Sequence, residues 1–287
     1  MKKTLSLLIV CIFISSGIGV AAAHGQSTLS PHSASPLDDD VPVWNVGDAW
    51  TYTIHNITVN YTQGAQGIFI DGNIDDFSWT VSDTTGDYYT VAVTGKVNAT
   101  YDFSLASQSS TIRFVGSFKP TLTRLKGTMQ FTKSDLQIHS LSFQLLGLTM
   151  TKINSLPFAL PFPFRLVSEG SLSVDFPLFD FPLYGLKFWD LPDFTLTMSS
   201  TFAGIFGLIQ LPFTVTVHHS WVPLSFWAFD KQDVTVEAGT YSAYRITSIV
   251  WDYFVYYYAP DVGNLIKIDA SLPNGGAHAE LKSTNYP

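Results

Sequence analysis

The chain has 287 residues, which is enough for one large domain or two small ones. Aromatic residues make up 15% and charged residues only 13% of the sequence. This balance is typical of all-β proteins, because aromatic and β-branched side chains suit pleated strands. The formal net charge is -8, and it becomes -10 if Lys2 and Lys3 are removed with a leader. The acidic balance excludes an extended nucleic-acid surface and argues against electrostatic attachment to anionic lipid head groups.

Residues 1–23 have the layout of a secretory signal peptide. Two lysines near the start precede an apolar run from Leu5 to Ile14, and Ala21 to Ala23 place small residues at the cleavage subsites. An uncleaved N-terminal anchor is the alternative, since the apolar stretch is just long enough to span a bilayer. The sequence therefore predicts a secreted or otherwise extracytoplasmic protein, which stays tethered if the leader is retained.

The rest of the chain divides into a spacer and one folded unit. Residues 24–43 are rich in Ser, Pro and Asp and are predicted to form a flexible spacer. Residues 44–287 are predicted to form a single β domain. Cys11, the only cysteine, lies inside the leader. The exported part is therefore expected to have no disulfide and to depend on a large hydrophobic core.

Strand signals follow one another at short intervals. Between Tyr89 and Phe103 every second residue is apolar or small, while the interleaved positions, apart from Ala92, carry Thr, Lys, Asn or Asp. This is the two-residue period of a strand with one wet side. The alternation returns in 124–132, 171–176 and 213–218, which favours an antiparallel meander over parallel α/β units. The best helical candidate, Ser200 to Ile209, is short and is weakened by two glycines.

The middle of the chain interleaves prolines with phenylalanines. Six prolines fall between Leu156 and Pro192, and no Asp, Glu, Lys or Arg occurs from Phe194 to Phe229. Because proline lacks the N–H that a central strand needs, this region is predicted to mix edge strands with extended loops that cap or line something apolar. The phenylalanines expected to line an apolar concavity are Phe143, Phe158, Phe162, Phe179, Phe194, Phe206 and Phe213.

The segment from Val234 to Lys267 carries the clearest local pattern. It predicts a strand, a tight turn at Ala238–Gly239, two further strands, and a turn bracketed by Pro260 and Gly263 before a last strand. Within it, Trp251 to Tyr258 has aromatic residues on both strand faces. This indicates a strand covered on both sides, with a carbohydrate-stacking platform as the alternative.

Together these patterns predict an all-β, mainly antiparallel fold. We expect one large curled sheet or half-barrel with an apolar concave face, covered by Pro/Phe-rich loops and at most short helices. Three segments also carry a family resemblance: Pro182 to Trp189, Val234 to Tyr244 and Tyr257 to Gly263. In these segments the chain resembles secreted β-proteins of the LolA/LolB lipoprotein-carrier fold. The resemblance implies a curled antiparallel sheet with a lid, and a lipid or other apolar ligand in the concavity.

Three N-glycosylation sequons begin at Asn56, Asn60 and Asn98. A separate acidic segment, Asp71 to Asp76, is similar to the start of a calcium loop but lacks the glycine at its sixth position. An Asp/Asn-rich hairpin turn is therefore the preferred interpretation of that segment.

No catalytic or metal-binding motif stands out. His218 and His219 are adjacent, so on a strand they would point to opposite faces and could not share a metal ion. The sequence has no metalloprotease, nucleophile-elbow or phosphate-loop motif, and we expect no cofactor and no enzymatic activity.

The leading hypothesis is an exported protein that binds or carries a lipid-like ligand in a sheet-lined groove. A structural or adhesive module at the cell surface and a carbohydrate-binding domain are the alternatives. The expected partners are an apolar small molecule or lipid, with a membrane surface or cell-envelope component as a further candidate, and no nucleic acid.

Overall fold

The computed structural model describes residues 40–63, 66–106, 111–154, 157–204, 209–219, 225–248, 254–272 and 275–287. Apart from one 3-10 turn, η1 (Pro260–Val262), the elements in these residues are all strands. The strands are β1 (Ala49–Gln63), β2 (Gln66–Asp83), β3 (Tyr88–Ala106), β4 (Thr111–Thr132), β5 (Ile138–Ile153), β6 (Leu160–Phe176), β7 (Lys187–Asp190), β8 (Phe194–Gly204), β9 (Ile209–His219), β10 (Ser225–Val236), β11 (Gly239–Ser248), β12 (Phe254–Ala259), β13 (Asn264–Leu272) and β14 (Gly275–Thr284).

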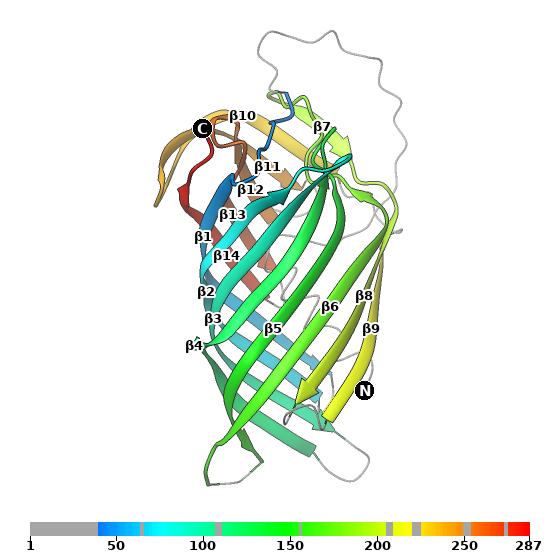
Figure 1. Cartoon of the computed structure of the whole chain (residues 1–287), viewed down its shortest axis with the longest axis vertical. Helices are drawn as coiled ribbons and strands as arrows, with labels where there is room; N and C mark the ends of the chain where they lie inside the picture. Colours follow the sequence, from blue (N-terminus) through cyan, green and yellow to red (C-terminus); the bar gives the residue numbers. More distant parts are fainter. Residues whose placement is uncertain are drawn as a thin grey trace.

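All fourteen strands belong to one antiparallel sheet, in the order β7-β10-β11-β12-β13-β14-β1-β2-β3-β4-β5-β6-β8-β9. The pairing of β1 with β14 joins the N-terminal meander to the C-terminal one. The sheet is open, with β7 and β9 at its two edges. Figure 1 shows that it is strongly curled, with long tilted strands β2 to β6 and shorter strands β10 to β13 across the fold. The predicted all-β, antiparallel, curled fold is confirmed.

The two-residue period explains why these segments form strands. In β3, Val91, Val93 and Val97 are buried, while Lys96 and Asn98, which alternate with them, are exposed. The apolar side chains therefore share the concave face, and the polar ones face solvent. The weak helical candidate Ser200 to Ile209 forms no helix in the part that the structure describes, where 200–204 ends β8 and Ile209 begins β9. No helix among the described residues is both long and apolar enough to cross a bilayer.

The hairpin turn predicted at Asp71 to Asp76 is also wrong. This segment lies inside β2, where the register with β3 shifts between Asp75 and Ser78. Asp76 has a φ of 49°, and such local kinks are typical of a β-bulge. Its carboxylate forms ion pairs with Lys96 of β3 and Lys282 of β14. The acidic segment therefore bends one strand and links it to two others.

Prolines occupy places where a strand lacks a partner. Pro161 and Pro163 precede Phe164, where the pairing of β6 with β8 begins, so their part of β6 pairs on one side only within the described chain. Pro120 lies in the irregularity between β4 and β5, and Pro212 lies in the edge strand β9. The missing proline N–H therefore costs few ladder hydrogen bonds, as the sequence predicted.

The strand and turn pattern predicted for Val234 to Lys267 is confirmed. Strands β10 and β11 form a hairpin whose two-residue turn is Glu237–Ala238, one position before the predicted pair, and Gly239, with a φ of 143°, begins β11. Gly263, with a φ of 63°, ends η1 and leads into β13. Phe254 to Tyr258 is buried on both faces except for the half-buried Tyr257, whereas 251–253 lies outside the described residues. The aromatic strand is therefore part of the core.

Candidate functional site

One half of the concave face, which we call the proximal half, is filled by side chains of the Pro/Phe-rich segment 177–191. The hydroxyl of Tyr256 in β12 donates to the carbonyl of Leu178 at 2.7 Å. The hydroxyl of Tyr244 in β11 donates to the carbonyl of Leu183 at 3.1 Å. The ring of Phe179 packs on that of Tyr258, with centroids 4.9 Å apart. The loop therefore covers β11 and β12 as the sequence suggested.

Indole and phenol groups anchor the rest of the proximal half to the turn after β12. Trp44 and Trp50 donate their indole N–H groups to the carbonyls of Gly263 and Val262 at 2.9 and 2.8 Å. Tyr52 donates to the carbonyl of Leu265 at 2.9 Å, and burial raises the pKa of its phenol. The phenol therefore stays neutral and remains a donor. The proximal half is a packed, hydrogen-bonded core.

The same apolar face continues along β3 to β6 into the other half of the sheet, where the described residues provide no second layer. The register aligns inward-facing positions of four strands, for example Phe118 of β4 with Thr149 of β5 and Phe162 of β6. We call this surface the distal apolar face, and it consists of Tyr101, Phe103, Phe114, Phe118, Leu145, Phe162, Phe164 and Leu166.

Side chains of the distal apolar face touch one another but are not fully enclosed. The ring centroid of Tyr101 lies 4.9 Å from that of Phe103 and 4.8 Å from that of Phe118. Phe118 also contacts Phe164, with centroids 5.2 Å apart. Of the eight side chains only Tyr101 and Phe164 are buried, and the others are half-buried. The face is therefore a continuous apolar surface with residual exposure.

A group of hydroxyls lies beneath this surface. The Tyr101 hydroxyl lies 2.8 Å from the Thr149 hydroxyl and 2.6 Å from the Thr151 hydroxyl, and Thr149 donates to the carbonyl of Ser117 at 2.9 Å. Gly116 makes room for the phenol, because a Cβ there would lie 2.4 Å from its oxygen. These hydroxyls hydrogen-bond to one another, so a ligand on this face does not need polar groups to pair with them.

Two of the predicted lining residues lie on the inward side of β5 and β6. Phe143 is buried over Gly127, where a Cβ would come within 2.5 Å of its ring. Phe162 is half-buried opposite Thr149 in the distal apolar face. The concave face therefore contains both residues, with Phe143 in its packed part.

The other predicted lining residues lie elsewhere. Phe179 and Phe194 are packed in the core, the latter edge-on against Phe176 with centroids 5.4 Å apart. Phe158 is 55% exposed just before β6, outside the concave face. Phe206 and the side chain of Phe213 lie outside the described residues. The sequence-based prediction groups these phenylalanines because they occur in one Phe-rich region. The strand register shows that those among the described residues occupy different parts of the fold.

Sequence reasoning missed four of the eight residues of the distal apolar face, namely Phe114, Phe118, Leu145 and Leu166. The alternation of Leu141, Phe143 and Leu145 was present, but Leu146 and Leu148 on the outer face of β5 obscure it. In β4 the irregularity between Phe118 and Thr123 shifts the period. A search for alternation that allows one bulge per strand would have found these residues.

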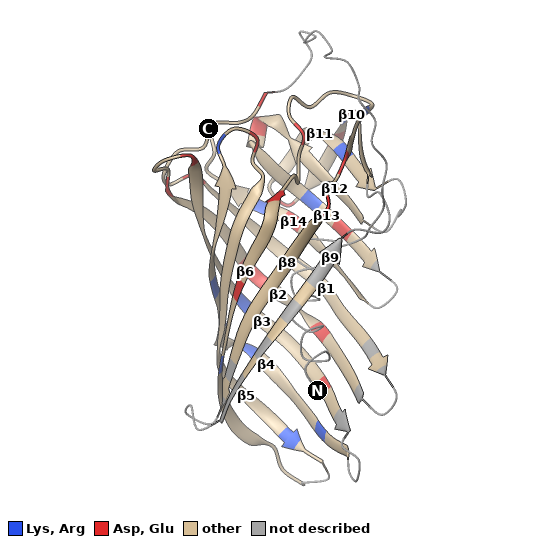
Figure 2. Cartoon of the chain, turned by 90° about the vertical axis from the view of Figure 1, so that its right-hand side faces the viewer, with Lys and Arg blue, Asp and Glu red and all other residues tan. Residues whose placement is uncertain are grey.

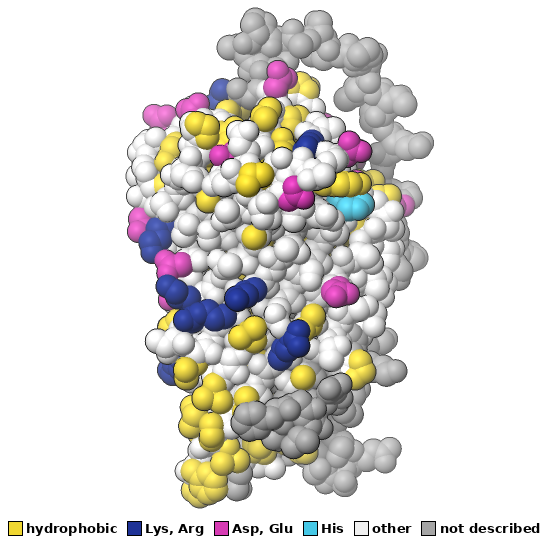
Figure 3. All heavy atoms as spheres, viewed as in Figure 1, with side chains coloured by type: hydrophobic (Ala, Val, Ile, Leu, Met, Phe, Trp, Pro, Cys, Tyr) yellow, Lys and Arg dark blue, Asp and Glu magenta, His cyan; other side chains and the backbone are white. Residues whose placement is uncertain are grey.

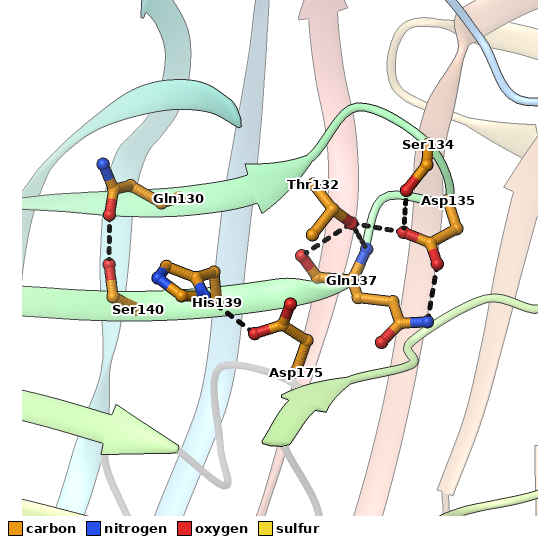
Figure 4. Close-up of polar contacts among 8 residues, drawn as sticks. All are labelled: Gln130, Thr132, Ser134, Asp135, Gln137, His139, Ser140 and Asp175. Atoms are coloured by element: carbon orange, nitrogen blue, oxygen red, sulfur yellow. Dashed lines mark hydrogen bonds and ion pairs between the residues drawn. The ribbon is translucent and has the colours of Figure 1, made fainter. Parts of the chain in front are cut away.

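A polar cluster near the β4–β5 turn contains a histidine–carboxylate pair, shown in Figure 4. His139 Nδ1 lies 2.8 Å from Asp175 Oδ1, and the imidazole stacks on Tyr88 with centroids 4.4 Å apart. The neighbouring hydroxyl of Ser140 donates to the amide oxygen of Gln130 at 2.7 Å, away from the imidazole. The pair therefore links β5 to the end of β6 and lacks an aligned nucleophile among the contacts of the described residues.

The rest of that cluster shapes the turn. The carboxylate of Asp135 accepts hydrogen bonds from the Thr132 hydroxyl, from the Ser134 hydroxyl at 2.9 Å and from the Gln137 amide at 2.7 Å. Leu136 has a φ of 53° within the same turn and is fully buried. These hydrogen bonds hold the β4–β5 turn in shape, so the cluster has a structural role.

The side chains of the sequon asparagines Asn56, Asn60 and Asn98 are all exposed. His55 stacks on His278 of β14 with centroids 5.7 Å apart, while the side chains of the adjacent pair at 218–219 lie outside the described residues. In the described ranges, no group of three or more His, Cys, Asp or Glu side chains is placed to hold a metal ion.

Comparison with known proteins finds no matching family model, no matching curated protein and no matching solved structure. The resemblance to the LolA/LolB fold therefore stays a prediction that depends on the three segments named above.

Proposed function

We propose that this protein is an exported, non-enzymatic binder or carrier of an apolar, lipid-like ligand, which lies on the distal apolar face. One observation supports this most directly: the inward apolar face continues past the end of the packed core without a covering layer among the described residues. An apolar sheet face requires a partner that removes it from water. A bound hydrocarbon would supply that partner.

The chemistry of the face suits a hydrocarbon chain better than a polar molecule. Its exposed atoms belong to phenylalanine rings and leucines, and its hydroxyls are already paired. Burial of each methylene of an acyl chain would contribute about 0.8 kcal/mol before the entropic cost of binding. Affinity would therefore rise with chain length, which is a property of carriers for acyl chains.

The experiment compares two neighbouring leucines on opposite faces of β5. Leu145 faces inward between Leu125 and Leu166, whereas Leu146 faces outward between Arg124 and Arg165. The exported protein is titrated with a fluorescent fatty acid. Saturable binding is expected, with affinity about 10-fold weaker in Leu145→Gln, or about 1.4 kcal/mol, and unchanged in Leu146→Gln.

A lipid extract of the protein from its native host provides the second measurement. Mass spectrometry should find a co-purified acyl lipid, and unfolding midpoints of the two variants show whether each remains folded. If no co-purified lipid is found and the fluorescent fatty acid shows no saturable binding, the proposal is wrong. Equal weakening by the two leucine variants would place the ligand elsewhere.

A separate observation favours a carbohydrate-binding function as a second candidate. Phe188 and Trp227 are neighbours in the β7–β10 pair and are 40% and 38% exposed. The ring centroids of Phe229 and Trp227 are 5.6 Å apart, and the Arg245 guanidinium lies over the ring of Phe229. Such exposed rings can stack on sugars. Binding to insoluble polysaccharides that is lost in Trp227→Ala would support this candidate.

A further inference from the structure

The end of the molecule where β5 and β6 meet carries an exposed apolar surface. Figure 3 shows hydrophobic side chains gathered at this lower end, below a band of Lys and Arg side chains. Five of the thirteen exposed large apolar residues in the described chain lie here, each between 40% and 55% exposed, so the exposure is concentrated rather than scattered. We call this surface the apolar tip, and it consists of Ile112, Val115, Met150, Phe158 and Leu160.

The sheet register places three residues of the apolar tip, Val115, Met150 and Leu160, on neighbouring strands at the same end of the sheet. Val115 is paired with Lys152, Ser117 is paired with Met150, and Leu160 is paired with Thr151. Ile112 and Leu160 lie at the ends of strands that carry the distal apolar face, whereas Val115 and Met150 point outward. The tip therefore wraps around the rim of the sheet.

Basic residues concentrate next to this tip although the whole chain is acidic. The chain has 15 Lys and Arg against 23 Asp and Glu, yet β4 and β5 contain no acidic residue. In β6 only Glu169 and Asp175 are acidic. Figure 2 shows the same segregation, with acidic side chains more frequent toward the opposite end. The basic residues of these three strands, here called the basic band, are Arg113, Lys119, Arg124, Lys126, Lys152 and Arg165.

Much of this positive charge is not neutralised within the fold. Arg113 is paired with Asp102 of β3. Lys119, Lys126 and Lys152 are exposed, and no carboxylate among the described residues lies within ion-pair distance of them. Free ammonium groups beside an exposed apolar surface match the two layers of a lipid monolayer, namely phosphate head groups above hydrocarbon.

We propose that the apolar tip inserts into the surface of a bilayer that contains anionic phospholipids, and that the basic band contacts the lipid phosphates. Interfacial protein segments bury their apolar side about 5–10 Å deep. Along β5, Leu146 in the Arg124–Arg165 row is four residues from Met150, or about 13 Å at 3.3 Å per residue. Lys119 lies closer still, two residues along β4 from Ser117, the partner of Met150, so the cations of Lys119, Arg124 and Arg165 stand at head-group height when the tip is inserted. Lys152 is paired with Val115 and lies at the level of the tip, where its long side chain can extend to the head groups.

Charge also selects this occupant over a second copy of the chain. Two tips facing one another would bring two basic bands together, and like charges repel. An anionic membrane instead attracts the basic band and repels the acidic opposite end, which orients the molecule with its tip toward the lipid. The overall charge of -8 hides this polarity, because it averages the two ends.

The membrane-docking proposal depends on residues of the apolar tip and the basic band, which are not part of the proposed ligand site. Where it is combined with the proposed function, docking would bring the open end of the distal apolar face to the bilayer, because Leu160 and Ile112 border that face. A lipid tail could then pass between membrane and sheet without crossing water.

The test measures co-sedimentation of the protein, in the form recovered after export, with two kinds of vesicle. One contains phosphatidylcholine with phosphatidylglycerol, and the other contains phosphatidylcholine alone. Binding to the anionic vesicles is expected to be stronger and to weaken with added salt. The double variant Phe158→Ser/Leu160→Ser should bind about 10-fold more weakly to both kinds of vesicle.

A charge variant separates the two parts of the proposal. Lys119→Gln/Lys126→Gln/Lys152→Gln should remove the preference for anionic vesicles. Two control variants away from the tip, Phe188→Ser in β7 and Lys231→Gln in β10, should bind like the unmodified protein. All of these residues are exposed, and unfolding midpoints confirm that each variant is folded.

Three outcomes would overturn the proposal: no binding to either vesicle, equal loss in tip and control variants, or a dimer in analytical ultracentrifugation that Phe158→Ser/Leu160→Ser dissociates. The last result would identify the tip as a contact between copies. The ligand proposal has its own readout, since Leu145→Gln should weaken fatty-acid binding and leave vesicle binding intact, while the tip variant should do the reverse.

Discussion

The proximal and distal halves of the sheet have the same alternating pattern but differ in how much of their apolar face is covered by other residues. In β3, Tyr89 is 5% exposed and packs on Trp44, whereas Phe103, further along the same face, is only half-buried. The difference lies in what faces them. Trp44 and the later segment 177–191 cover the proximal half, and no described residue forms a layer over the distal half. An apolar strand face is therefore stable only when it is buried, and either the chain itself or a ligand can cover it.

Strand length explains where the cover ends. Strand β4 has 22 residues and spans about 70 Å, whereas β12 in the covering meander has 6 residues and spans about 20 Å. The short strands and the Pro/Phe-rich loop can pack against one end of the long strands only. The long strands extend beyond them, and the distal apolar face and the apolar tip lie on that extension.

The largest expected effect tests whether the two halves differ in packing. Trp50 is fully buried, donates a hydrogen bond and contacts Trp44, so Trp50→Ala should lower the free energy of unfolding by about 3–5 kcal/mol. Phe118→Ala in the distal face should cost less than about 2 kcal/mol, because Phe118 is only half-buried. Urea unfolding followed by tryptophan-independent far-UV circular dichroism measures both. Equal losses would contradict the division into two halves.

The cover of the proximal half can be tested by removal of a single oxygen. Tyr256→Phe leaves the carbonyl of Leu178 without its 2.7 Å donor in a buried place, so about 1–3 kcal/mol of stability should be lost. The neighbouring Tyr257 is half-buried, and Tyr257→Phe should change stability by less than about 0.5 kcal/mol. If the two variants unfold at the same urea concentration, the loop does not depend on this bond.

A smaller effect is expected from added bulk in the distal half. In Gly116→Ala the new Cβ would lie 2.4 Å from the hydroxyl oxygen of Tyr101 and 2.6 Å from the carbonyl oxygen of Met150, so the phenol must move away from Thr149 and Thr151 and the backbone of β5 must shift. We expect a loss of about 1–2 kcal/mol of stability together with weaker fatty-acid binding. Ser117→Ala, one position along and on the outer face, is the matched control. Unchanged ligand binding in Gly116→Ala would place the ligand away from Tyr101.

The smallest effect concerns the bulge in β2. Hydrogen bonds from Lys96 and Lys282 lower the pKa of Asp76. A lowered pKa means that this stabilisation is present above the unfolded-state pKa, near 4, and is lost as the pH falls through the lower folded-state value. Because the Asp76 side chain is 42% exposed and its ion pairs are therefore screened by solvent, Asp76→Asn should cost less than about 1 kcal/mol at neutral pH.

The pH dependence provides the check on that pair. The difference in unfolding free energy between Asp76→Asn and the unmodified protein should shrink toward zero as the pH falls below 4. A difference that persists in acid would show that the side chain acts through the shape of the bulge and not through its charge.

Much of the fold could be predicted from local pattern. The alternation in β3, the hairpin turn next to Gly239 and the turn between Pro260 and Gly263 all depend on neighbouring residues, because side-chain direction and positive φ are local properties. Asp71 to Asp76 misled the prediction, because a bulge and a turn use the same residue types. The lining phenylalanines could not be assigned, since composition does not record which face of which strand they occupy.

By itself, the sequence determined that this chain forms antiparallel strands with one apolar face, because a period of two residues leaves no other way to bury that face. Only the tertiary structure decided which part of the face is covered. That outcome depends on β14 lying beside β1 and on Asp76 meeting Lys282, contacts between residues more than 200 positions apart. The apolar tip and the basic band likewise arise from register across β4 to β6, and no local stretch of sequence contains either.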